Sequence, residues 1–532
     1  MKRNLVHIYI CGAQLALCFC SISVAAAAEP VSIGKRRQLL MDDLFVQQAM
    51  GVEFVVHPPR KTGDVIARSD VSQGLGGVSV LHDEGVYHLW YGCGAGLAYA
   101  RSTDGINWVK PNLNLLKADA RREISPPPNA VVATGDGGER HRVGGGMVFL
   151  DPNARDAERF KLVTNSEDYD SNWLQIYASS DGIHWRHAYT NVITFQTNTR
   201  PFHLDSQNVI FWDERIQKYT AYFRKNVPRI PGQAALRTRT VARAESPELT
   251  RFGSVEDAPV VFEADAQHVI KFRLPNREDL SRVDAYTSGT IKYPWAENAY
   301  LMFPAEYYHY DADLAEFGTE VPINAGTLDT RFATSRDGVS WRRYDHRPFV
   351  GLGMKGEFDS VRIYMGYGIV PAKNNRELYM YYLGTSEPHG WNRDDRNNRL
   401  LTAAGLTPIE PVRAISRVVL RRDGFVSAYA PRTGGEFTTP LLRFTGEQLL
   451  VNVDTSSSGE LRVEILDEQS KPISNYTLNE CDLIHTANEI SRVVKWKGST
   501  SVKDLSGKPL RLRFVMRDAD LYAFQFAERD NL

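Results

Sequence analysis

The sequence has few cysteines, no surplus of charge of either sign, and one long apolar run. Five cysteines occur in 532 residues, and three of them (Cys11, Cys18 and Cys20) lie close together near the start of the chain, before Glu29. The remaining two, Cys93 and Cys481, are too few for a disulfide framework or a thiolate zinc site. The 63 Lys and Arg residues balance 64 Asp and Glu residues. This balance gives no reason to expect a nucleic acid as a partner.

The single apolar run, from Leu5 to Val24, opens the chain. Lys2 and Arg3 precede it, and four alanines at 25–28 follow it. This order predicts an export signal over residues 1–28, cleaved after Ala28, with an uncleaved anchor helix as the alternative. No other apolar stretch approaches the length needed to span a bilayer. We therefore expect a secreted or periplasmic protein that has no contact with the membrane after cleavage.

One motif, Ser-x-Asp-Gly-x-x-Trp, occurs three times, at 102–108, 179–185 and 335–341. Each copy follows a stretch that is typical of a strand. The Asp-Gly pair predicts a tight turn between two strands, and the Trp gives the returning strand an apolar anchor. We expect Trp108, Trp185 and Trp341 to occupy equivalent positions in the fold.

The spacing of the motif predicts five units of similar length. The interval from Asp181 to Asp337 is about twice the interval from Asp104 to Asp181, so one unit without the full motif belongs between them. A degenerate copy at 242–252 fits the gap, and Arg-Arg-Asp-Gly-Phe at 421–425 marks a fifth unit. A strand pair with alternating polarity precedes each turn, which makes four strands per unit. The sequence therefore predicts an all-β fold with a five-bladed β-propeller over residues 29–432.

Residues 433–532 differ in texture from the repeats. Short alternating segments are separated by Ser- and Gly-rich or charged turns, such as Ser-Ser-Ser-Gly at 456–459. This pattern predicts a C-terminal β-sandwich. A ring of blades also needs closure between its ends, so we expect residues 39–46 to pair with the last blade or to edge a sheet.

A propeller with a C-terminal sandwich and these turns resembles the glycosidases of families 32 and 43. The segments at 38–45, 205–214 and 519–524 resemble a group of secreted bacterial proteins related to family 32. The resemblance implies a glycoside hydrolase that acts on a plant or algal poly- or oligosaccharide without a cofactor. The sequence lacks the Trp-x-Asn-Asp-Pro-Asn and Arg-Asp-Pro motifs of family 32, so the catalytic residues of that family cannot be transferred.

The repeat indicates where charged groups would ring a propeller channel. The innermost strands start at one rim, and counting back to the start of each unit leads to Asp70, Arg142, Asp205, Asp284 and Asp359. A glycosidase needs two carboxylates, about 5–5.5 Å apart for retention or about 6.5–9.5 Å apart for inversion. We expect Asp205 to be catalytic, with Asp70 and Asp359 facing it. Asp is also favoured in turns, which is the structural alternative.

Other residues complete the predicted site. Glu306 lies among aromatic residues that would raise its pKa, so we expect it to be the proton donor, with a solvated edge-strand Glu as the alternative. Arg142, His203, Arg362 and Asp284 are expected to bind substrate. The pair His203 and Asp205 is too sparse to indicate a metal site.

Two further functions fit the same pattern. A carbohydrate-binding propeller without catalysis would use the axial Asp residues structurally or to hold a cation. A glycoside phosphorylase would use one carboxylate and would bind phosphate through Arg142 or Arg362. The identity of the sugar and the oligomeric state stay open.

Overall fold

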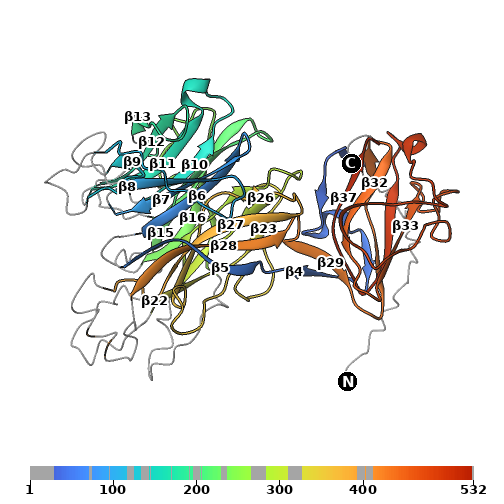
Figure 1. Cartoon of the computed structure of the whole chain (residues 1–532). Helices are drawn as coiled ribbons and strands as arrows, with labels where there is room; N and C mark the ends of the chain where they lie inside the picture. The colour runs from blue at the N-terminus through green and yellow to red at the C-terminus, as the bar shows by residue number, and fades with distance from the viewer. Residues whose placement is uncertain are drawn as a thin grey trace, which may run out of the picture.

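The computed structural model consists of β-strands arranged in two lobes (Figure 1). The predicted all-β class is confirmed, and the helices Asp43–Phe45, Asp156–Glu158 and Lys503–Leu505 are single 3₁₀ turns. In the part of the chain that the structure describes, no helix is long and apolar enough to cross a membrane. The structure describes residues 29–70, 75–94, 96–116, 125–133, 143, 145–168, 171–190, 192–195, 204, 206–228, 237–264, 283–309, 326–391, 399, 402 and 411–529.

Three sheets of the larger lobe are antiparallel meanders of four consecutive strands, as the first three units predict. The first contains β6 (Leu75–Asp83), β7 (Val86–Cys93), β8 (Gly96–Ser102) and β9 (Ala130–Ala133). The second contains β10 (Met147–Leu150), β11 (Phe160–Asp168), β12 (Ser171–Ser179) and β13 (Arg186–Thr190). The third contains β14 (Val209–Asp213), β15 (Lys218–Pro228), β16 (Arg237–Ser246) and β17 (Val260–Phe262).

The fourth unit is divided between two sheets. Its inner half consists of β18 (Val283–Thr287), β21 (Ala305–His309) and β22 (Gly326–Thr330). Its outer half consists of β19 (Ile291–Lys292), β20 (Tyr300–Met302), β23 (Ala333–Ser335) and β24 (Arg342–Arg343). The break falls at Pro304, which has no N–H for a ladder hydrogen bond, and at Gly289, whose φ is +54°. The inner half joins the next unit through parallel pairing of Leu328 with Arg362.

The last unit of the larger lobe is completed by an N-terminal strand. It contains β25 (Arg362–Met365), β26 (Val370–Pro371), β27 (Glu377–Thr385) and β28 (Val412–Arg421), and β5 (Arg60–Asp70) pairs antiparallel with β28. Residues 39–46 do not pair with this unit, and of the two predicted places the edge of a sheet is the one that the structure shows for Leu39. β2 (Gln38–Leu39) instead edges a sheet of the smaller lobe, where it pairs with β37 (Ala519–Ala527).

The smaller lobe consists of two sheets that share one hydrophobic core. One sheet contains β4 (Glu53–Val56), β29 (Val426–Ala430), β37, β32 (Gln448–Asp454) and β35 (Asn488–Val493), and the other contains β3 (Gln48–Met50), β30 (Gly435–Thr438), β36 (Arg511–Arg517), β33 (Glu460–Leu466) and β34 (Ile484–His485). β1 (Val31–Gly34) pairs with β31 (Leu442–Phe444) beside them. Residues 31–56, which were predicted to belong to the propeller, therefore contribute their strands to the smaller lobe. Alternate residues of β36 are buried, so the sheet that contains it turns its apolar face inward.

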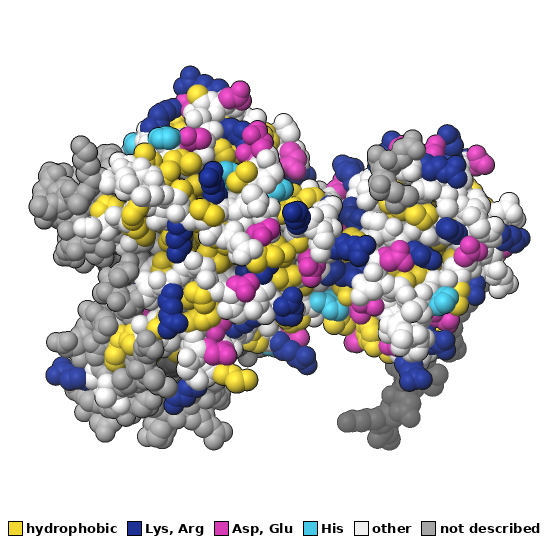
Figure 2. All heavy atoms as spheres, viewed as in Figure 1, with side chains coloured by type: hydrophobic (Ala, Val, Ile, Leu, Met, Phe, Trp, Pro, Cys, Tyr) yellow, Lys and Arg dark blue, Asp and Glu magenta, His cyan; other side chains and the backbone are white. Residues whose placement is uncertain are grey.

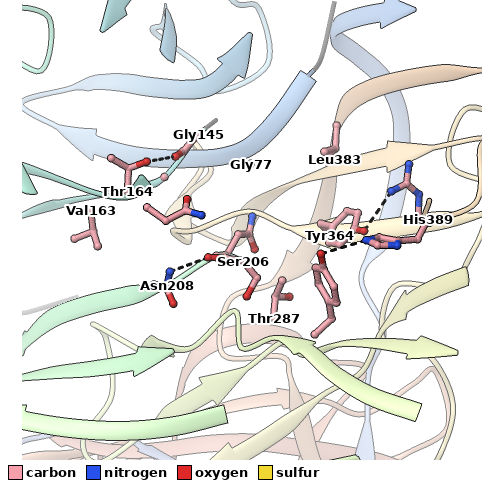
Figure 3. A pocket seen from close by; sticks show the side chains of 15 residues that line it. Gly77, Gly145, Val163, Thr164, Ser206, Asn208, Thr287, Tyr364, Leu383 and His389 are labelled. Atoms are coloured by element: carbon pink, nitrogen blue, oxygen red, sulfur yellow. Dashed lines mark hydrogen bonds between the residues drawn. The ribbon is translucent and has the colours of Figure 1, made fainter. Parts of the chain in front are cut away.

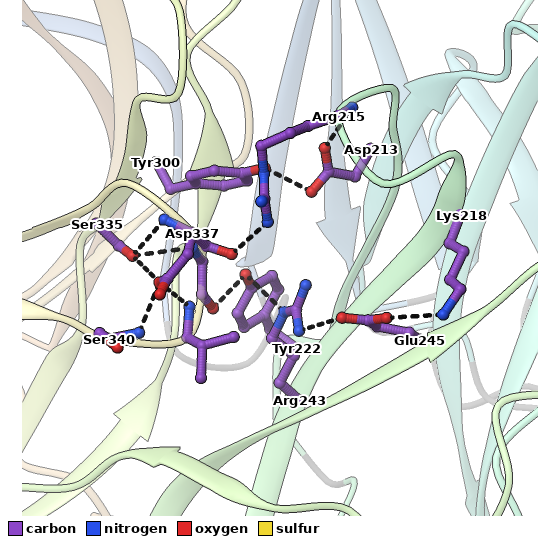
Figure 4. Close-up of polar contacts among 12 residues, drawn as sticks. Asp213, Arg215, Lys218, Tyr222, Arg243, Glu245, Tyr300, Ser335, Asp337 and Ser340 are labelled. Atoms are coloured by element: carbon purple, nitrogen blue, oxygen red, sulfur yellow. Dashed lines mark hydrogen bonds and ion pairs between the residues drawn. The ribbon is translucent and has the colours of Figure 1, made fainter. Parts of the chain in front are cut away.

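The three Ser-x-Asp-Gly-x-x-Trp turns occupy equivalent environments, as the repeat predicts. In the turn at Asp337, the carboxylate Oδ1 accepts the N–H groups of Val339 and Ser340 at 2.8 Å each (Figure 4). Each turn packs on an aromatic residue from the second strand of a neighbouring sheet, which donates a hydrogen bond to the carbonyl of the turn glycine. The pairs are Trp90 with Gly182 at 2.7 Å, Tyr222 with Gly338 at 2.7 Å and Tyr381 with Gly105 at 2.6 Å.

The tryptophans of these turns contact the same three aromatic side chains edge-on. Trp185 contacts Trp90, Trp341 contacts Tyr222 and Trp108 contacts Tyr381, with ring centroids 6.4, 6.2 and 5.5 Å apart. The last of these contacts joins the first meander to the unit that β5 completes.

Candidate functional site

A cavity of about 190 Å³ lies where the inner strands of the larger lobe converge. Its lining comes from every unit of that lobe: β6, the start of β10, β11, the approach to β14, β18, β25 and β27. The lining residues are Gly77, Gly145, Gly146, Val163, Thr164, Asn165, Ser206, Gln207, Asn208, Tyr286, Thr287, Arg362, Tyr364, Leu383 and His389. Figure 3 shows Tyr364 and His389 on one side of the cavity and Ser206 and Asn208 on the other.

One wall of the cavity carries a cation and aromatic rings. Arg362 is 8% exposed, and its Nη2 donates to Glu387 Oε1 at 2.5 Å. Tyr364 lies next to it, with its hydroxyl 3.4 Å from Arg362 Nη1. His389 is held between two tyrosines, with Nε2 3.2 Å from the Tyr286 hydroxyl and Nδ1 3.3 Å from the Tyr307 hydroxyl. This wall therefore presents one guanidinium and a linked set of hydroxyl and imidazole groups.

A buried ion pair supports this wall from behind. Asp284 is fully buried, and its carboxylate accepts from Arg239 Nη1 at 2.5 Å and contacts His309 Nε2 at 2.8 Å. Burial alone would raise the pKa of Asp284, but the charges and hydrogen bonds of His309 and Arg239 hold it well below its usual value. The Arg239 guanidinium also lies over the ring of Tyr286, 5.2 Å from its centroid. Asp284 therefore stays ionised and holds the Arg239 guanidinium against the ring of Tyr286.

The opposite wall consists of amide and hydroxyl groups that precede β14. Asn208 Nδ2 donates to the carbonyls of Leu204 and Ser206 at 3.0 and 2.8 Å, which determines the orientation of the amide. Within the described part of the chain, Ser206 Oγ, Gln207 Oε1 and Asn208 Oδ1 are buried and have no hydrogen-bond partner. Unsatisfied buried acceptors are costly and point to a ligand or water that fills the cavity.

Close backbone packing explains the glycines at 145 and 146. A Cβ on Gly146 would lie 2.4 Å from the carbonyl oxygen of Val163, and a Cβ on Gly145 would lie 2.9 Å from the backbone of Gly77. A side chain at either position would therefore push apart the backbone segments that line the cavity.

Two of the predicted catalytic carboxylates point away from the cavity. Tyr382 and Leu383 are adjacent on β27 and point to opposite faces. Leu383 lines the cavity, whereas the Tyr382 hydroxyl donates to Asp359 Oδ2 at 2.8 Å on the other face. Lys61 Nζ lies 2.7 Å from the same oxygen. The expectation that Asp359 faces the channel is therefore wrong.

Glu306 is displaced by the same alternation. Tyr307 lies beside His389, so the neighbouring Glu306 faces the opposite side of β21. There it is fully buried, 3.2 Å from Arg343 Nη1, and it accepts from the Tyr308 hydroxyl at 3.0 Å. The expectations of a channel-facing proton donor and of a solvated edge-strand Glu are both incorrect, because the side chain is paired in the interior.

The other predicted site residues divide into two groups. Arg142, His203 and Asp205 lie outside the described residues, and the structure describes only the backbone of Asp70, which ends β5 opposite Val412. Arg362 lines the cavity. Asp284 does not line it, but is paired with Arg239 behind the cavity residue Tyr286.

Several cavity residues escaped the sequence reasoning. Tyr286 follows Asp284 by two residues on the same strand, and His389 and Glu387 follow the second strand of the last unit. His389 lies four residues beyond the end of β27, so inspecting the ends of the second strands would have led to it. The described residues contain no group of three or more His, Cys, Asp or Glu side chains that could hold a metal ion.

Figure 2 shows both signs of charge interspersed over the visible face of the two lobes.

No family model matches the sequence, and no curated protein matches it. The chain is similar at low identity to solved structures of carbohydrate-processing proteins. A thermostable family-43 glycoside hydrolase is 13% identical, with a TM-score of 0.43, over 69% of this chain and 94% of that one. An N-acetylgalactosamine deacetylase from F. plautii, in complex with blood group B trisaccharide, is 15% identical, with a TM-score of 0.42, over 71% and 97% of the two chains.

A structure from work on the GH130 family of mannoside phosphorylases and hydrolases is 13% identical, with a TM-score of 0.38, over 74% of this chain and 96% of that one. Family 43 thus occurs among the similar structures, whereas family 32 has no matching family model. Structural similarity at these TM-scores and identities does not assign a function to this chain. The chemistry of the cavity is the basis for a functional assignment.

Proposed function

We propose that this protein is a secreted glycoside hydrolase whose active site is the cavity of the larger lobe. The observation that carries the proposal is the lining of that cavity, to which every unit of the lobe contributes. It combines tyrosine rings, a buried guanidinium and unsatisfied amide and hydroxyl oxygens. Sugars are bound by this combination of aromatic surface and convergent polar groups.

In this proposal the units of the larger lobe are the five blades of a propeller. Consecutive sheets are in contact, and the Trp108–Tyr381 contact brings the first against the last. The cavity then lies on the axis of the ring. The smaller lobe is a sandwich that combines residues 31–56 with residues 426–529, and residues 1–28 are an export signal. The intact mass of the secreted protein tests the signal, since cleavage after Ala28 removes the whole segment from Met1 to Ala28.

Asp205 and Asp70 are the catalytic carboxylates of the proposal. Ser206, Gln207 and Asn208, which follow Asp205 directly, all line the cavity, and Asn208 anchors the carbonyl of Leu204 on its other side. Asp70 ends β5, shortly before β6 leads to the cavity residue Gly77. Two carboxylates supply both the acid and the base or nucleophile of glycoside hydrolysis, so the reaction needs no cofactor.

Turnover of a glycan library by the secreted protein and two variants tests this proposal. Asp205→Asn should lower the rate by about three orders of magnitude or more with an unchanged melting temperature, because the carboxylate acts on the transition state. Asp359→Asn is the matched control and should keep the rate. Equal rates for the wild type and Asp205→Asn would contradict the role of Asp205.

Two alternative functions are distinguished in the same assay. A phosphorylase would use Arg362 on phosphate, and its turnover would require inorganic phosphate. A binding propeller would retain glycan affinity without turnover. Either result would replace hydrolysis as the function of the cavity.

A further inference from the structure

We propose that the sugar bound in the cavity carries a carboxylate, as a uronic acid does, and that this anion lies against Arg362. The inference rests on the proposed function and specifies the substrate class of the same site.

The first observation is an excess of positive charge at the cavity wall. Arg362 Nη2 and Arg413 Nε donate to the same oxygen, Glu387 Oε1, at 2.5 and 2.7 Å. Two guanidinium groups therefore share one carboxylate, and the group has a net charge of +1. Arg362 is buried, so water compensates this charge poorly. A ligand anion would compensate it in a site where an unbalanced ion is costly.

The carboxylate of Asp284 does not balance this group. Asp284, the carboxylate behind the same wall, is paired with Arg239 and lies next to His309. Arg224 and Arg239 both lie over the ring of Tyr286, at 5.5 and 5.2 Å from its centroid. Asp284 is therefore already engaged by Arg239 and His309 and is not the counter-ion of Arg362.

The hydrogen bonds of Arg362 leave one part of the guanidinium for a ligand. Nε donates to Thr385 Oγ1 and to the Glu387 carbonyl at 2.8 and 2.7 Å, and Nη2 is held by Glu387 Oε1. Nη1 has only the long 3.4 Å contact with the Tyr364 hydroxyl among the bonds of the described residues. A carboxylate beside Tyr364 could accept from Nη1 and from that hydroxyl, and both bonds would be charge-assisted because the acceptor is ionised.

The opposite wall fits the rest of a sugar ring. Asn208 is only 5% exposed, and its Oδ1 has no partner within the described residues, as is true of Gln207 Oε1 and Ser206 Oγ. These oxygens can accept hydrogen bonds from ring hydroxyls. The volume of about 190 Å³ is below the range of about 300–1,000 Å³ that holds drug-sized ligands. The cavity therefore suits a single ring with its anion at one end and its hydroxyls at the other.

Calorimetric titration of the secreted protein tests this inference. The probes are D-glucuronate and D-galacturonate, their methyl esters, D-glucose and D-galactose, and inorganic phosphate and sulfate. At least one acid should bind about tenfold more tightly than its methyl ester, because a charge-assisted hydrogen bond is lost on esterification. The difference should decrease as salt is added.

A variant of Arg413 separates charge from structure. Arg362 is buried and its replacement can unfold the protein, whereas Arg413 is partly exposed. Arg413→Gln leaves Arg362 balanced by Glu387, so the preference for the acid over its ester should fall about tenfold while neutral sugars bind as before. Arg492→Gln removes the same charge from the smaller lobe and should leave the preference unchanged.

The outcomes separate this inference from the proposed function. Equal binding of acids, esters and neutral sugars would overturn the inference and leave the glycosidase proposal standing. Binding of phosphate or sulfate without any uronate would also overturn it, because the site would then take a free oxyanion. Failure of every sugar to bind, together with no turnover in the glycan library, would overturn the proposed function itself.

Discussion

Lys61 Nζ lies 2.7 Å from Asp359 Oδ2 and joins β5 to the segment before β25. The two residues are 298 positions apart in the chain, so their contact exists only because the N-terminal strand returns to complete the last unit. Asp359 is 2% exposed, and the Tyr382 hydroxyl donates to the same oxygen. The carboxylate thus stabilises the contact between β5 and the last unit of the larger lobe, and it is turned away from the cavity.

Asp359→Asn should therefore lower stability and spare activity. We expect the free energy of unfolding to fall by about 1–3 kcal/mol, the usual effect of weakening a buried hydrogen bond to a charged group. Denaturant unfolding measures the change, and turnover is measured on the folded variant. A variant that keeps its stability but loses its activity would indicate that Asp359 is catalytic.

The turn at Gly182 should not accept a side chain. Its φ is +73°, and a Cβ would lie 2.7 Å from Cζ2 of the buried Trp90. Gly182→Ala should cost about 1–3 kcal/mol of stability, because the backbone is strained and the indole is displaced. Gly253→Ala is the matched control: its φ is +83° and nothing lies within 4 Å of the added Cβ. Equal losses in the two variants would show that the contact with Trp90 contributes nothing.

The turn carboxylates should make stability depend on acid pH. Burial would raise the pKa of Asp337, but hydrogen bonds from the turn, including the backbone N–H groups of Ser340 and Val339, lower it. Its contribution is present above the unfolded pKa of about 3.9 and is lost as the pH falls further. The stability difference between the wild type and Asp337→Asn should shrink from pH 5 to pH 2 in denaturant unfolding. Val339→Ala in the same turn should give a difference independent of pH, and a constant difference for Asp337→Asn would contradict the assignment.

The two remaining cysteines should behave as inert thiols. Cys93 and Cys481 are buried and no disulfide joins them. Burial raises the pKa of Cys481 to about 11, opposed by a hydrogen bond from the Val463 N–H. A thiol reagent at pH 8 should modify Cys481 only after unfolding, and reductant should leave the melting temperature unchanged. Rapid labelling of the native protein, detected by peptide mass, would contradict the burial of this thiol.

Local sequence determined the turns and the strand character of this protein. The Ser-x-Asp-Gly-x-x-Trp motif contains its own hydrogen-bond acceptors and its own positive-φ glycine, so each copy forms the same turn wherever the chain carries it. Strand alternation likewise acts over a few residues. The all-β class and the equivalent environments of Trp108, Trp185 and Trp341 could therefore be predicted without a structure.

Tertiary structure alone decided which side chains reach the cavity. Glu306 and Tyr307 are adjacent on β21, and only the packing of neighbouring sheets determines which of them contacts the cavity residue His389. The partners of the carboxylates are also distant in sequence: Arg343 for Glu306 and Lys61 for Asp359. A shift of one residue in strand register moves a side chain to the opposite face of the sheet. A buried carboxylate needs a cation or hydrogen-bond donors beside it to offset the free energy of desolvation. Both conditions depend on contacts between strands and sheets that are distant in sequence, which no local pattern contains.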